Sequence, residues 1–341
     1  MKLDLHEILK EQLTDLWRGW EESSIFISGG TGFFGKWLLE SHLWLGSELG
    51  LKTQVTVLSR NPEAFLKAHP QFKHPSIAFI QGDVRQEVSS TKSFDLVIHA
   101  ATEASAKLNA EDPMLMMDVI LEGTRNILDF AAKNKAKKFL NVSSGAVYGE
   151  QPQEINLIPE TYQGAPDPTN LTTAYGNGKR TSELFGFIAA KQHSFDCVSA
   201  RGFAFVGPYL PLDTHFAVGN FIGDSLKEKP IVIKGDGLAQ RSYLYGEDLA
   251  IWLWTLLLQG ATGEAYNLGS DQGVSITELA TLVSESAPVK LPIEGPLAKA
   301  NGDFRHKYLP SIEKARVLGL DVWTPLDLAV EKTYAWHKEQ N

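Results

Sequence analysis

Tyr175 and Lys179 are the residues whose types and spacing point most directly to chemistry. They lie four positions apart, so on a helix they share one face, one turn from each other. An ammonium group in that position can lower the pKa of the phenol, which can then exchange protons near neutrality. The pair often arises by chance, but Ser143 and Ser144 end an apolar stretch upstream of it. Together these residues indicate hydride transfer at a hydroxyl or ketone carbon.

Three glycines after the first apolar stretch indicate a dinucleotide-binding turn. Gly29 would allow the tight turn, Gly32 would let a pyrophosphate approach the backbone, and Gly35 would let helix and strand pack closely. The free N–H groups and the positive dipole end of the following helix would bind the phosphates. We therefore expect cofactor contacts from Gly29, Thr31, Gly32, Phe33, Phe34 and Gly35.

The end of the second predicted strand bears on the choice of dinucleotide. NAD binders usually place Asp or Glu there to hold the ribose 2′-hydroxyl, whereas this chain has Ser59 and Arg60. A hydroxyl and a guanidinium suit a 2′-phosphate. We expect NADP(H), with NAD(H) as the alternative if Arg60 is simply a solvated loop residue. The ends of the next two strands and the catalytic pair should supply further cofactor contacts: Asp83, Val84, Ala100, Ala101, Thr102, Tyr175 and Lys179.

Apolar strands alternate with helical patterns through the first two thirds of the chain. Strands are predicted at 24–28, 53–59, 77–81, 96–100 and 139–142, and helices at 34–45, 61–68, 115–133 and 174–191. This alternation predicts a doubly wound parallel (Rossmann) sheet of the α/β class.

Three regions are predicted along the chain. Residues 1–23 are expected to contain an amphipathic helix (3–20) packed on the edge of the next region. Residues 24–201 should form the NAD(P)-binding Rossmann domain with the catalytic residues. Residues 202–341, where Gly and Pro interrupt shorter apolar runs, should form a smaller mixed α/β substrate-binding part, some of whose segments return to the Rossmann domain.

Composition excludes several classes of function. The net charge of −9 argues against nucleic acid as a partner, because no basic stripe offsets it. Cys197 is the single cysteine, which excludes an intramolecular disulfide and a cysteine-built metal site, and no metal is expected. The most apolar run, 251–258, is too short for a bilayer, which needs about 20 residues, and is predicted to be a buried helix. We expect a cytoplasmic enzyme that does not bind membranes.

From residue 24 onward the chain resembles the extended short-chain dehydrogenase/reductase family, specifically its nucleotide-sugar NAD-dependent epimerase/dehydratase branch. The resemblance rests on motifs that are specific in combination: Gly29-x-x-Gly32-x-x-Gly35, 123–126 (GTRN), 143–149 (SSGAVYG), Tyr175-x-x-x-Lys179, 201–208 (RGFAFVGP) and 241–248 (RSYLYGED).

This resemblance implies roles for individual residues. Tyr175 would be the acid/base, Lys179 would hold the nicotinamide ribose and lower the phenol pKa, and Ser144 would bind the reacting sugar oxygen. Arg241 would grip the substrate diphosphate. Further substrate contacts are expected from Ser143, Phe203, Asn220 and Arg305.

Departures from the family pattern narrow the reaction. Gly145 and Ala146 stand where the family's dehydratases carry Asp-Glu, and neither can move a proton, so a 4,6-dehydratase is disfavoured. With Arg60, this favours NADPH-dependent reduction of a nucleotide-diphospho-4-keto-6-deoxyhexose at C4. The alternatives are an NAD-dependent nucleotide-sugar 4-epimerase, a reductase of a non-sugar ketone, and a non-catalytic dinucleotide sensor.

The resemblance also implies a homodimer, built through the helices at 113–133 and 174–191. Met114, Met116, Met117 and Phe130 could serve this interface, although core packing is equally compatible with them.

Overall fold

The computed structural model describes residues 14–102, 105–214, 216–288, 290–296 and 306–340. Its centre is a seven-stranded sheet in the order β11-β6-β5-β4-β1-β2-β3, and every neighbouring pair of strands is parallel. The strands are β1 (Ser24–Ser28), β2 (Gln54–Ser59), β3 (Ile77–Gln81), β4 (Leu96–His99), β5 (Lys138–Ser144), β6 (Asp196–Gly202) and β11 (Glu264–Leu268). The predicted doubly wound parallel sheet is confirmed.

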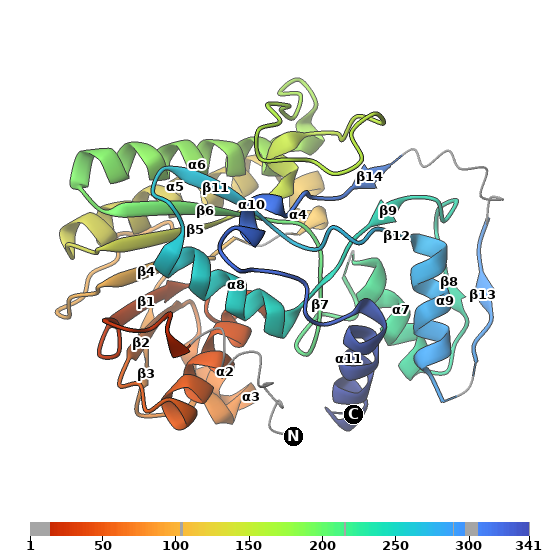
Figure 1. Cartoon of the computed structure of the whole chain (residues 1–341), viewed down its shortest axis with the longest axis horizontal. Helices are drawn as coiled ribbons and strands as arrows, with labels where there is room; N and C mark the ends of the chain where they lie inside the picture. Colours follow the sequence, from red (N-terminus) through yellow and green to blue (C-terminus); the bar gives the residue numbers. More distant parts are fainter. Residues whose placement is uncertain (1–13, 103–104, 215, 289, 297–305, 341) are drawn as a thin grey trace.

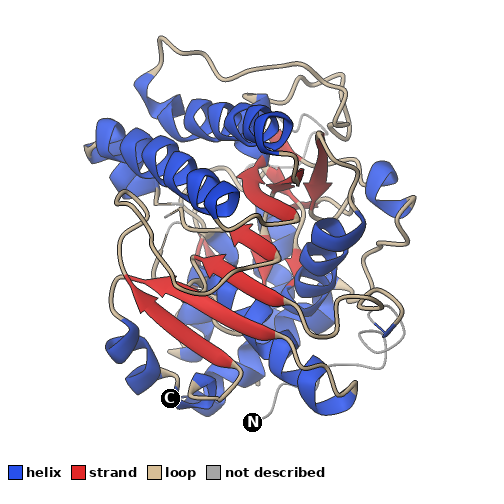
Figure 2. Cartoon of the chain, turned by 90° about the vertical axis from the view of Figure 1, so that its left-hand side faces the viewer, coloured by secondary structure: helices blue, strands red, loops and turns tan. Residues whose placement is uncertain are grey.

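Helices cover both faces of this sheet (Figures 1 and 2). Alternate side chains of a strand point to opposite faces, so Ile25 and Ile27 join one apolar cluster and Phe26 joins another. The first cluster includes α2 (Phe33–Glu48) and α8 (Gly246–Gln259), and the second includes α5 (Pro113–Lys133) and α6 (Ala174–His193). A sheet buried on both faces explains why its strands are continuous apolar runs.

The run 251–258 lies within α8 and all of its side chains are buried, which confirms the predicted buried helix. None of the helices that the structure describes has the length and apolar character needed to cross a membrane.

The order of the strands creates a switch point between β1 and β4. From β1 the chain proceeds through β2 to β3 in one direction, and later strands extend from β4 in the other. Ligands of open α/β sheets bind in the crevice at the carboxyl ends of the strands where this reversal occurs. The ends of β1, β4 and β5 carry Ser28, His99 and Ser144, so the predicted cofactor and catalytic segments meet at one edge.

The C-terminal part contains short strands and helices around a second apolar cluster (Figure 1). Its elements are β7 (Phe205–Val206), α7 (Ala217–Leu226), β8 (Ile231–Val232), β9 (Gln240–Arg241), β10 (Leu244–Tyr245), β12 (Val274–Ser275), α9 (Ile276–Ser286), β13 (Ile293–Glu294), β14 (Lys307–Tyr308) and α11 (Leu326–Gln340). Strand β14 pairs with β9, which also pairs with β12. Two segments from the same stretch of sequence, α8 and β11, belong instead to the seven-stranded sheet and its covering helices, which we call the main sheet unit.

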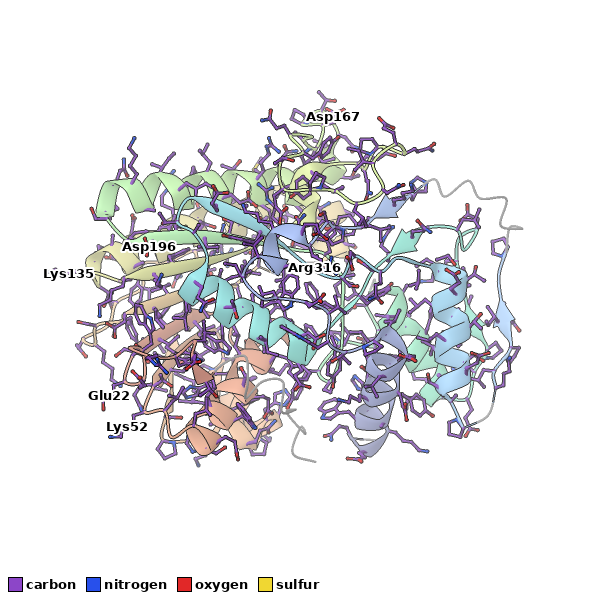
Figure 3. All side chains as sticks on the ribbon, in the orientation of Figure 1. Glu22, Lys52, Lys135, Asp167, Asp196 and Arg316 are labelled. Carbon is purple, nitrogen blue, oxygen red and sulfur yellow. The ribbon has the colours of Figure 1, made fainter. Side chains whose placement is uncertain are left out.

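Shorter helical segments complete the described chain: α3 (Pro62–Ala68), η1 (Pro70–Phe72), α4 (Ala106–Glu111), η2 (Gly145–Tyr148), η3 (Leu171–Thr173) and α10 (Glu313–Arg316). Arg316, labelled in Figure 3, forms ion pairs with Asp271, Glu313 and Asp321 at 2.7–3.2 Å. The pair with Asp271 connects α10 to the loop that follows β11, whereas Glu313 lies within α10 and Asp321 follows it.

The helix predicted at 3–20 falls mostly on residues 1–13, which lie outside the described residues. Its described end differs from the prediction, because residues 15–19 form a turn. Gly19 has φ of +86°, a left-handed conformation that ends helical segments. Trp17 packs edge-to-face on Trp254 of α8, with ring centroids 5.2 Å apart, so this segment does pack on the main sheet unit.

Candidate active site

The glycine turn between β1 and α2 is bare backbone held by close contacts. Gly29 has φ of +81°, and a Cβ there would lie 2.4 Å from the Ala100 backbone. A Cβ on Gly35 would lie 2.3 Å from the Gly30 backbone. At Gly32 a Cβ would meet only the Gly29 carbonyl oxygen, at 3.4 Å. The side of Gly32 is therefore open, and the turn fits the close approach of a pyrophosphate.

The start of α2 provides a favourable environment for anions. Gly32 is the N-cap residue and accepts a hydrogen bond from the Lys36 N–H, and the first turn carries no acidic side chain. The N–H groups of Phe33, Phe34 and Gly35 begin the helix and have no acceptor in a preceding turn. Together with the helix dipole they favour phosphate binding, so these residues fit a dinucleotide.

The expected adenosine-side residues lie after β2 and β3. Arg60 is exposed, whereas Ser59 is buried and its hydroxyl accepts a hydrogen bond from the Asn61 N–H. Asp83 pairs with Arg85 at 2.9 Å. The hydrogen bond from Arg85 is the main cause of a lowered pKa of Asp83, and the positive charge of Arg60 adds to it. Asp83 is therefore engaged by Arg85 at this edge, within range of the charge of Arg60.

Val84 takes part in a structural contact, because its carbonyl accepts a hydrogen bond from the Asn126 amide at 2.9 Å. Ala100 follows β4, and its N–H donates to the Ser28 carbonyl of β1 at 2.9 Å. Ala101 and Thr102 continue this segment against the glycine turn, since the Ala101 nitrogen lies 2.6 Å from the position that a Gly29 Cβ would take.

Lys179 is a buried cation fixed between two strands. Its Nζ donates to the Thr102 hydroxyl at 2.9 Å and to the Val142 carbonyl at 2.8 Å. Burial lowers the pKa of Lys179 to about 7, and the nearby carboxylate of Glu183 opposes this shift. The structure thus brings the predicted cation to the ends of β4 and β5.

Tyr175 and Ser144 lie near enough to interact at this edge of the sheet. Burial raises the pKa of the Tyr175 phenol, and the interaction with Ser144 acts to lower it. This differs from the expectation that Lys179 depresses the phenol pKa. The reason is geometric, because the Lys179 ammonium is directed to Thr102 and Val142.

The side chain of Ser143 does not point toward Tyr175, as that of Ser144 does. Its hydroxyl donates to the Glu183 carboxylate at 2.6 Å, and Glu183 forms a largely buried ion pair with Arg201 at 2.7 Å. Consecutive residues of a strand face opposite sides, so only one of the two serines can reach the Tyr175 phenol. The structure therefore places Ser143 in a buried polar network, in contrast to its predicted contact with substrate.

The predicted substrate residues come from the C-terminal part. Arg241 donates from Nη1 to the carbonyls of Gln240 and His306, at 2.7 and 2.8 Å. Phe203 lies beside this region, after β6. Asn220 is half-buried in α7, and Arg305 lies outside the described residues.

Tyr308 is a site residue that sequence reasoning missed. Its ring packs on Phe203 with centroids 4.5 Å apart, and the Arg241 guanidinium lies 5.7 Å from its ring centroid. Burial raises the pKa of its phenol, and an interaction with Ser144 acts to lower it. A Cβ on Gly145 would lie 2.6 Å from the Tyr308 hydroxyl oxygen. Gly145 was the available signal, since a glycine just after the catalytic serine indicates that another group approaches closely.

The family comparison agrees with this geometry. Residues 25–269 match the model of the NAD dependent epimerase/dehydratase family. UDP-glucuronic acid decarboxylase 1 of Arabidopsis thaliana is 29% identical over 86% of this chain and 64% of its own length. The chain thus spans somewhat less than two thirds of that relative. UDP-glucuronic acid decarboxylase 3 of the same plant is 29% identical over 88% of this chain and 84% of its own length.

Solved structures show the same fold. The UDP-glucose 4-epimerase of Thermotoga maritima, in complex with UDP-glucose, superposes with a TM-score of 0.80 at 22% identity, over 93% of this chain and 99% of that one. Pal from Bacillus thuringiensis superposes with a TM-score of 0.78 at 26% identity, over 93% of this chain and all of that one. The glycine turn, the parallel sheet and the matched family model lead to one conclusion: this chain belongs to the NAD dependent epimerase/dehydratase family.

Proposed function

We propose that this chain transfers a hydride at C4 of the sugar in a nucleotide-diphosphosugar, with Tyr175 as the acid/base. The observation that carries the proposal is the meeting of Tyr175, Ser144 and the buried Lys179 at the carboxyl edge of the sheet, where the Lys179 Nζ donates to Thr102 and Val142. The open glycine turn follows β1, two strands away from β5 in the same sheet.

Each residue has a part in the proposed reaction. A bound nicotinamide dinucleotide supplies the hydride. Tyr175 donates its proton to the oxygen at C4 as negative charge develops there, and Ser144 donates a hydrogen bond to the same oxygen. Lys179, anchored at the ends of β4 and β5, would hold the ribose of that dinucleotide.

Arg241 is suited to the substrate diphosphate. Among the described residues its two hydrogen bonds both use Nη1. The Nη2 and Nε hydrogens are left to form a bidentate contact with a phosphate. The two carbonyl contacts would also hold the guanidinium plane in place.

The finer proposal is NADPH-dependent reduction of a nucleotide-diphospho-4-keto-6-deoxyhexose. Arg60 supports it, because this guanidinium is exposed after β2 at the place where NAD binders usually carry a carboxylate. The second candidate is an NAD-dependent 4-epimerase. The description of the matched family as NAD dependent favours that alternative.

We also propose that the chain is not a 4,6-dehydratase. In addition to lacking a proton-transferring side chain, position 145 has no space for one. A Cβ there would lie 2.6 Å from the Tyr308 hydroxyl and 2.8 Å from the Phe203 ring. An acidic residue at this position would require both rings to move.

A homodimer through α5 and α6 is the proposed assembly. Met114 of α5 and Leu184 and Ile188 of α6 are 70%, 57% and 45% exposed, which is unusual for apolar side chains on two packed helices. Met116 and Phe130 are buried in the core and cannot contribute.

Retained cofactor and a substrate panel test the proposed reaction. The purified protein would be analysed by mass spectrometry for bound NAD(H) or NADP(H), and then assayed with UDP-glucose, UDP-glucuronic acid and a nucleotide-linked 4-keto-6-deoxyhexose. We expect NADPH oxidation with the keto sugar. Tightly held NAD with interconversion of UDP-hexoses would instead establish the epimerase. Dinucleotide binding without turnover of any substrate would contradict both enzymatic proposals.

A further inference from the structure

Tyr175 lies in the first turn of its helix, and the ends of a helix open more easily than its middle. Helix α6 begins one residue before Tyr175, directly after the N-cap residue Thr173. A buried hydrogen bond that holds α6 to β5 lies one turn later, where the Lys179 Nζ donates to the Val142 carbonyl. The backbone that carries the proposed acid/base therefore needs a restraint of its own.

The N-cap residue of α6 does not supply this restraint. A cap side chain normally accepts a hydrogen bond from the backbone N–H two or three positions into the helix, but the Thr173 side chain makes no such bond. Its hydroxyl faces the carbonyls of Asp167 and Asn170, at 2.6 and 2.7 Å, and accepts from the Asn177 amide at 3.0 Å. The N–H of Tyr175, the second residue of the helix, is thus left to another acceptor.

Asn109 of α4 takes the place of the missing cap. Its side-chain oxygen accepts a hydrogen bond from the Tyr175 N–H at 2.9 Å, and its side-chain nitrogen donates to the Thr172 carbonyl at 2.6 Å. These two bonds fix the orientation of the amide, because only its oxygen can accept from an N–H and only its nitrogen can donate to a carbonyl. A single asparagine therefore holds the backbone on both sides of the helix start.

The chain that follows β4 holds both members of the proposed catalytic pair. The Thr102 hydroxyl, just after β4, accepts a hydrogen bond from the Lys179 Nζ at 2.9 Å. Helix α4 follows in the sequence, and the side chain of Ser105 caps its start. Asn109 of this helix then binds the backbone of Tyr175. The cation and the backbone of the phenol are thus anchored from one stretch of sequence at the expected dinucleotide edge of the sheet.

We infer that Asn109 is a positioning residue for the reaction proposed above. By keeping the first turn of α6 closed, it fixes the Tyr175 backbone and so the place of the phenol oxygen relative to the reacting oxygen at C4. It acts through that backbone and transfers no proton itself. A displacement of about 1 Å at a reacting group can lower a rate about 100-fold, so a restraint on this backbone has a measurable effect. The inference rests on the proposed acid/base role of Tyr175.

The test is hydrogen exchange at the Tyr175 amide, in the full-length protein with bound dinucleotide and no sugar. The protein would carry ¹⁵N-labelled tyrosine, and the Tyr175 resonance would be identified by its loss in Tyr175→Phe. Asn109→Ala removes both hydrogen bonds of the Asn109 amide. We expect the Tyr175 amide to exchange about tenfold faster in this variant, because the first turn of α6 loses its cap.

Two further variants make the result specific. Asn109→Asp keeps an acceptor for the Tyr175 N–H, which the helix dipole favours, while the carbonyl of the exposed Thr172 can turn to water. Its exchange should stay within about threefold of the wild-type rate.

Asn61→Ala is the matched control, because the Asn61 side chain accepts a hydrogen bond from the Ala64 N–H at 3.0 Å at the start of α3. It removes the same kind of cap and should leave the Tyr175 amide unchanged. Unchanged exchange in Asn109→Ala, equally fast exchange in Asn61→Ala, or exchange in Asn109→Asp as fast as in Asn109→Ala would each overturn the inference.

The exchange measurement needs no sugar substrate, so it separates this inference from the proposed function. If no nucleotide sugar is turned over while Asn109→Ala speeds the exchange, the reaction proposal fails and the restraint on Tyr175 is supported. If the wild-type protein does turn over a sugar, Asn109→Ala should lower kcat about tenfold at saturating dinucleotide, with little change in KM. Asn109→Asp should recover most of this loss, and Asn61→Ala should show none. Unaltered kcat in Asn109→Ala would overturn the inference.

Discussion

Lys179 shows most clearly how one residue connects the fold to its chemistry. Its position four residues after Tyr175 was apparent in the sequence, but its partners were not. The Thr102 hydroxyl and the Val142 carbonyl belong to segments that come together only in the folded sheet. The sequence also could not show which of the two adjacent serines faces the catalytic pair. The alternation of side chains along β5 directs Ser144 to Tyr175 and Ser143 to Glu183.

Lys179 also makes a testable contribution to stability. Because burial lowers its pKa from 10.5 to about 7, the folded protein bears the cost of a buried cation below about pH 7. Between about pH 7 and 10.5 the folded protein has lost this proton, while the unfolded chain still binds it. Folding then no longer buries a charge, so the free energy of unfolding rises with pH over this range. Wild-type stability relative to Lys179→Met should therefore increase over that range.

Thermal unfolding of both proteins without added dinucleotide, from about pH 6 to about pH 9, measures this difference. All other titrating groups are common to the two proteins and cancel to first order. A difference in Tm that does not vary with pH would contradict the lowered pKa of Lys179.

At the scale of elements, the β1–α2 turn was predictable because local backbone chemistry determines it. The three glycines, the preceding apolar strand and the following helix all lie within one short segment. Strand limits were less certain, and β5 extends beyond the predicted 139–142 to Lys138–Ser144. Residues 15–19, the described end of the helix predicted at 3–20, form a turn, and Trp17 there packs on Trp254 of α8, a contact that no local pattern reveals.

Substitution of Gly29 tests the account of this turn. Gly29→Ala would place a Cβ against the Ala100 backbone in addition to straining φ. We expect a loss of about 2–4 kcal/mol in the free energy of unfolding and loss of dinucleotide binding, measured by denaturant titration and calorimetry.

Gly263→Ala is the matched control for this variant. Gly263 has φ of +80°, and no atom lies within 4 Å of the position that a Cβ would take there, so only the backbone strain of about 1 kcal/mol should appear. Equal losses in the two variants would mean that the contact with Ala100 is unimportant.

At the scale of the whole molecule, the site joins the two parts of the chain. The main sheet unit supplies Ser144, Tyr175 and Lys179, and the C-terminal part supplies Arg241 and Tyr308 on the paired strands β9 and β14. Sequence periodicity identified the sheet because its strands are buried on both faces. It could not identify Tyr308, because β14 is a two-residue strand whose place depends on pairing with β9.

The proposed dimer is also a property of the whole molecule, and its mass in solution tests it. Leu184→Glu and Ile188→Glu together would place charges on the exposed apolar side of α6, and we expect the mass in solution to fall from that of a dimer to that of a monomer. Val317→Glu, at an apolar residue that is 85% exposed elsewhere, should have no such effect. Light scattering after size-exclusion chromatography distinguishes these outcomes, and a monomeric wild-type protein would refute the assembly.

The most direct test of the central claim follows the hydride itself. NADPH that carries deuterium at the transferring position would be supplied with a nucleotide-linked 4-keto-6-deoxyhexose, and the product sugar analysed by NMR. The account predicts deuterium at sugar C4 with the wild-type protein. It predicts none with Tyr175→Phe, which should still bind the dinucleotide. Deuterium at another carbon, or transfer by Tyr175→Phe at the wild-type rate, would contradict the assignment of Tyr175 as the acid/base at C4.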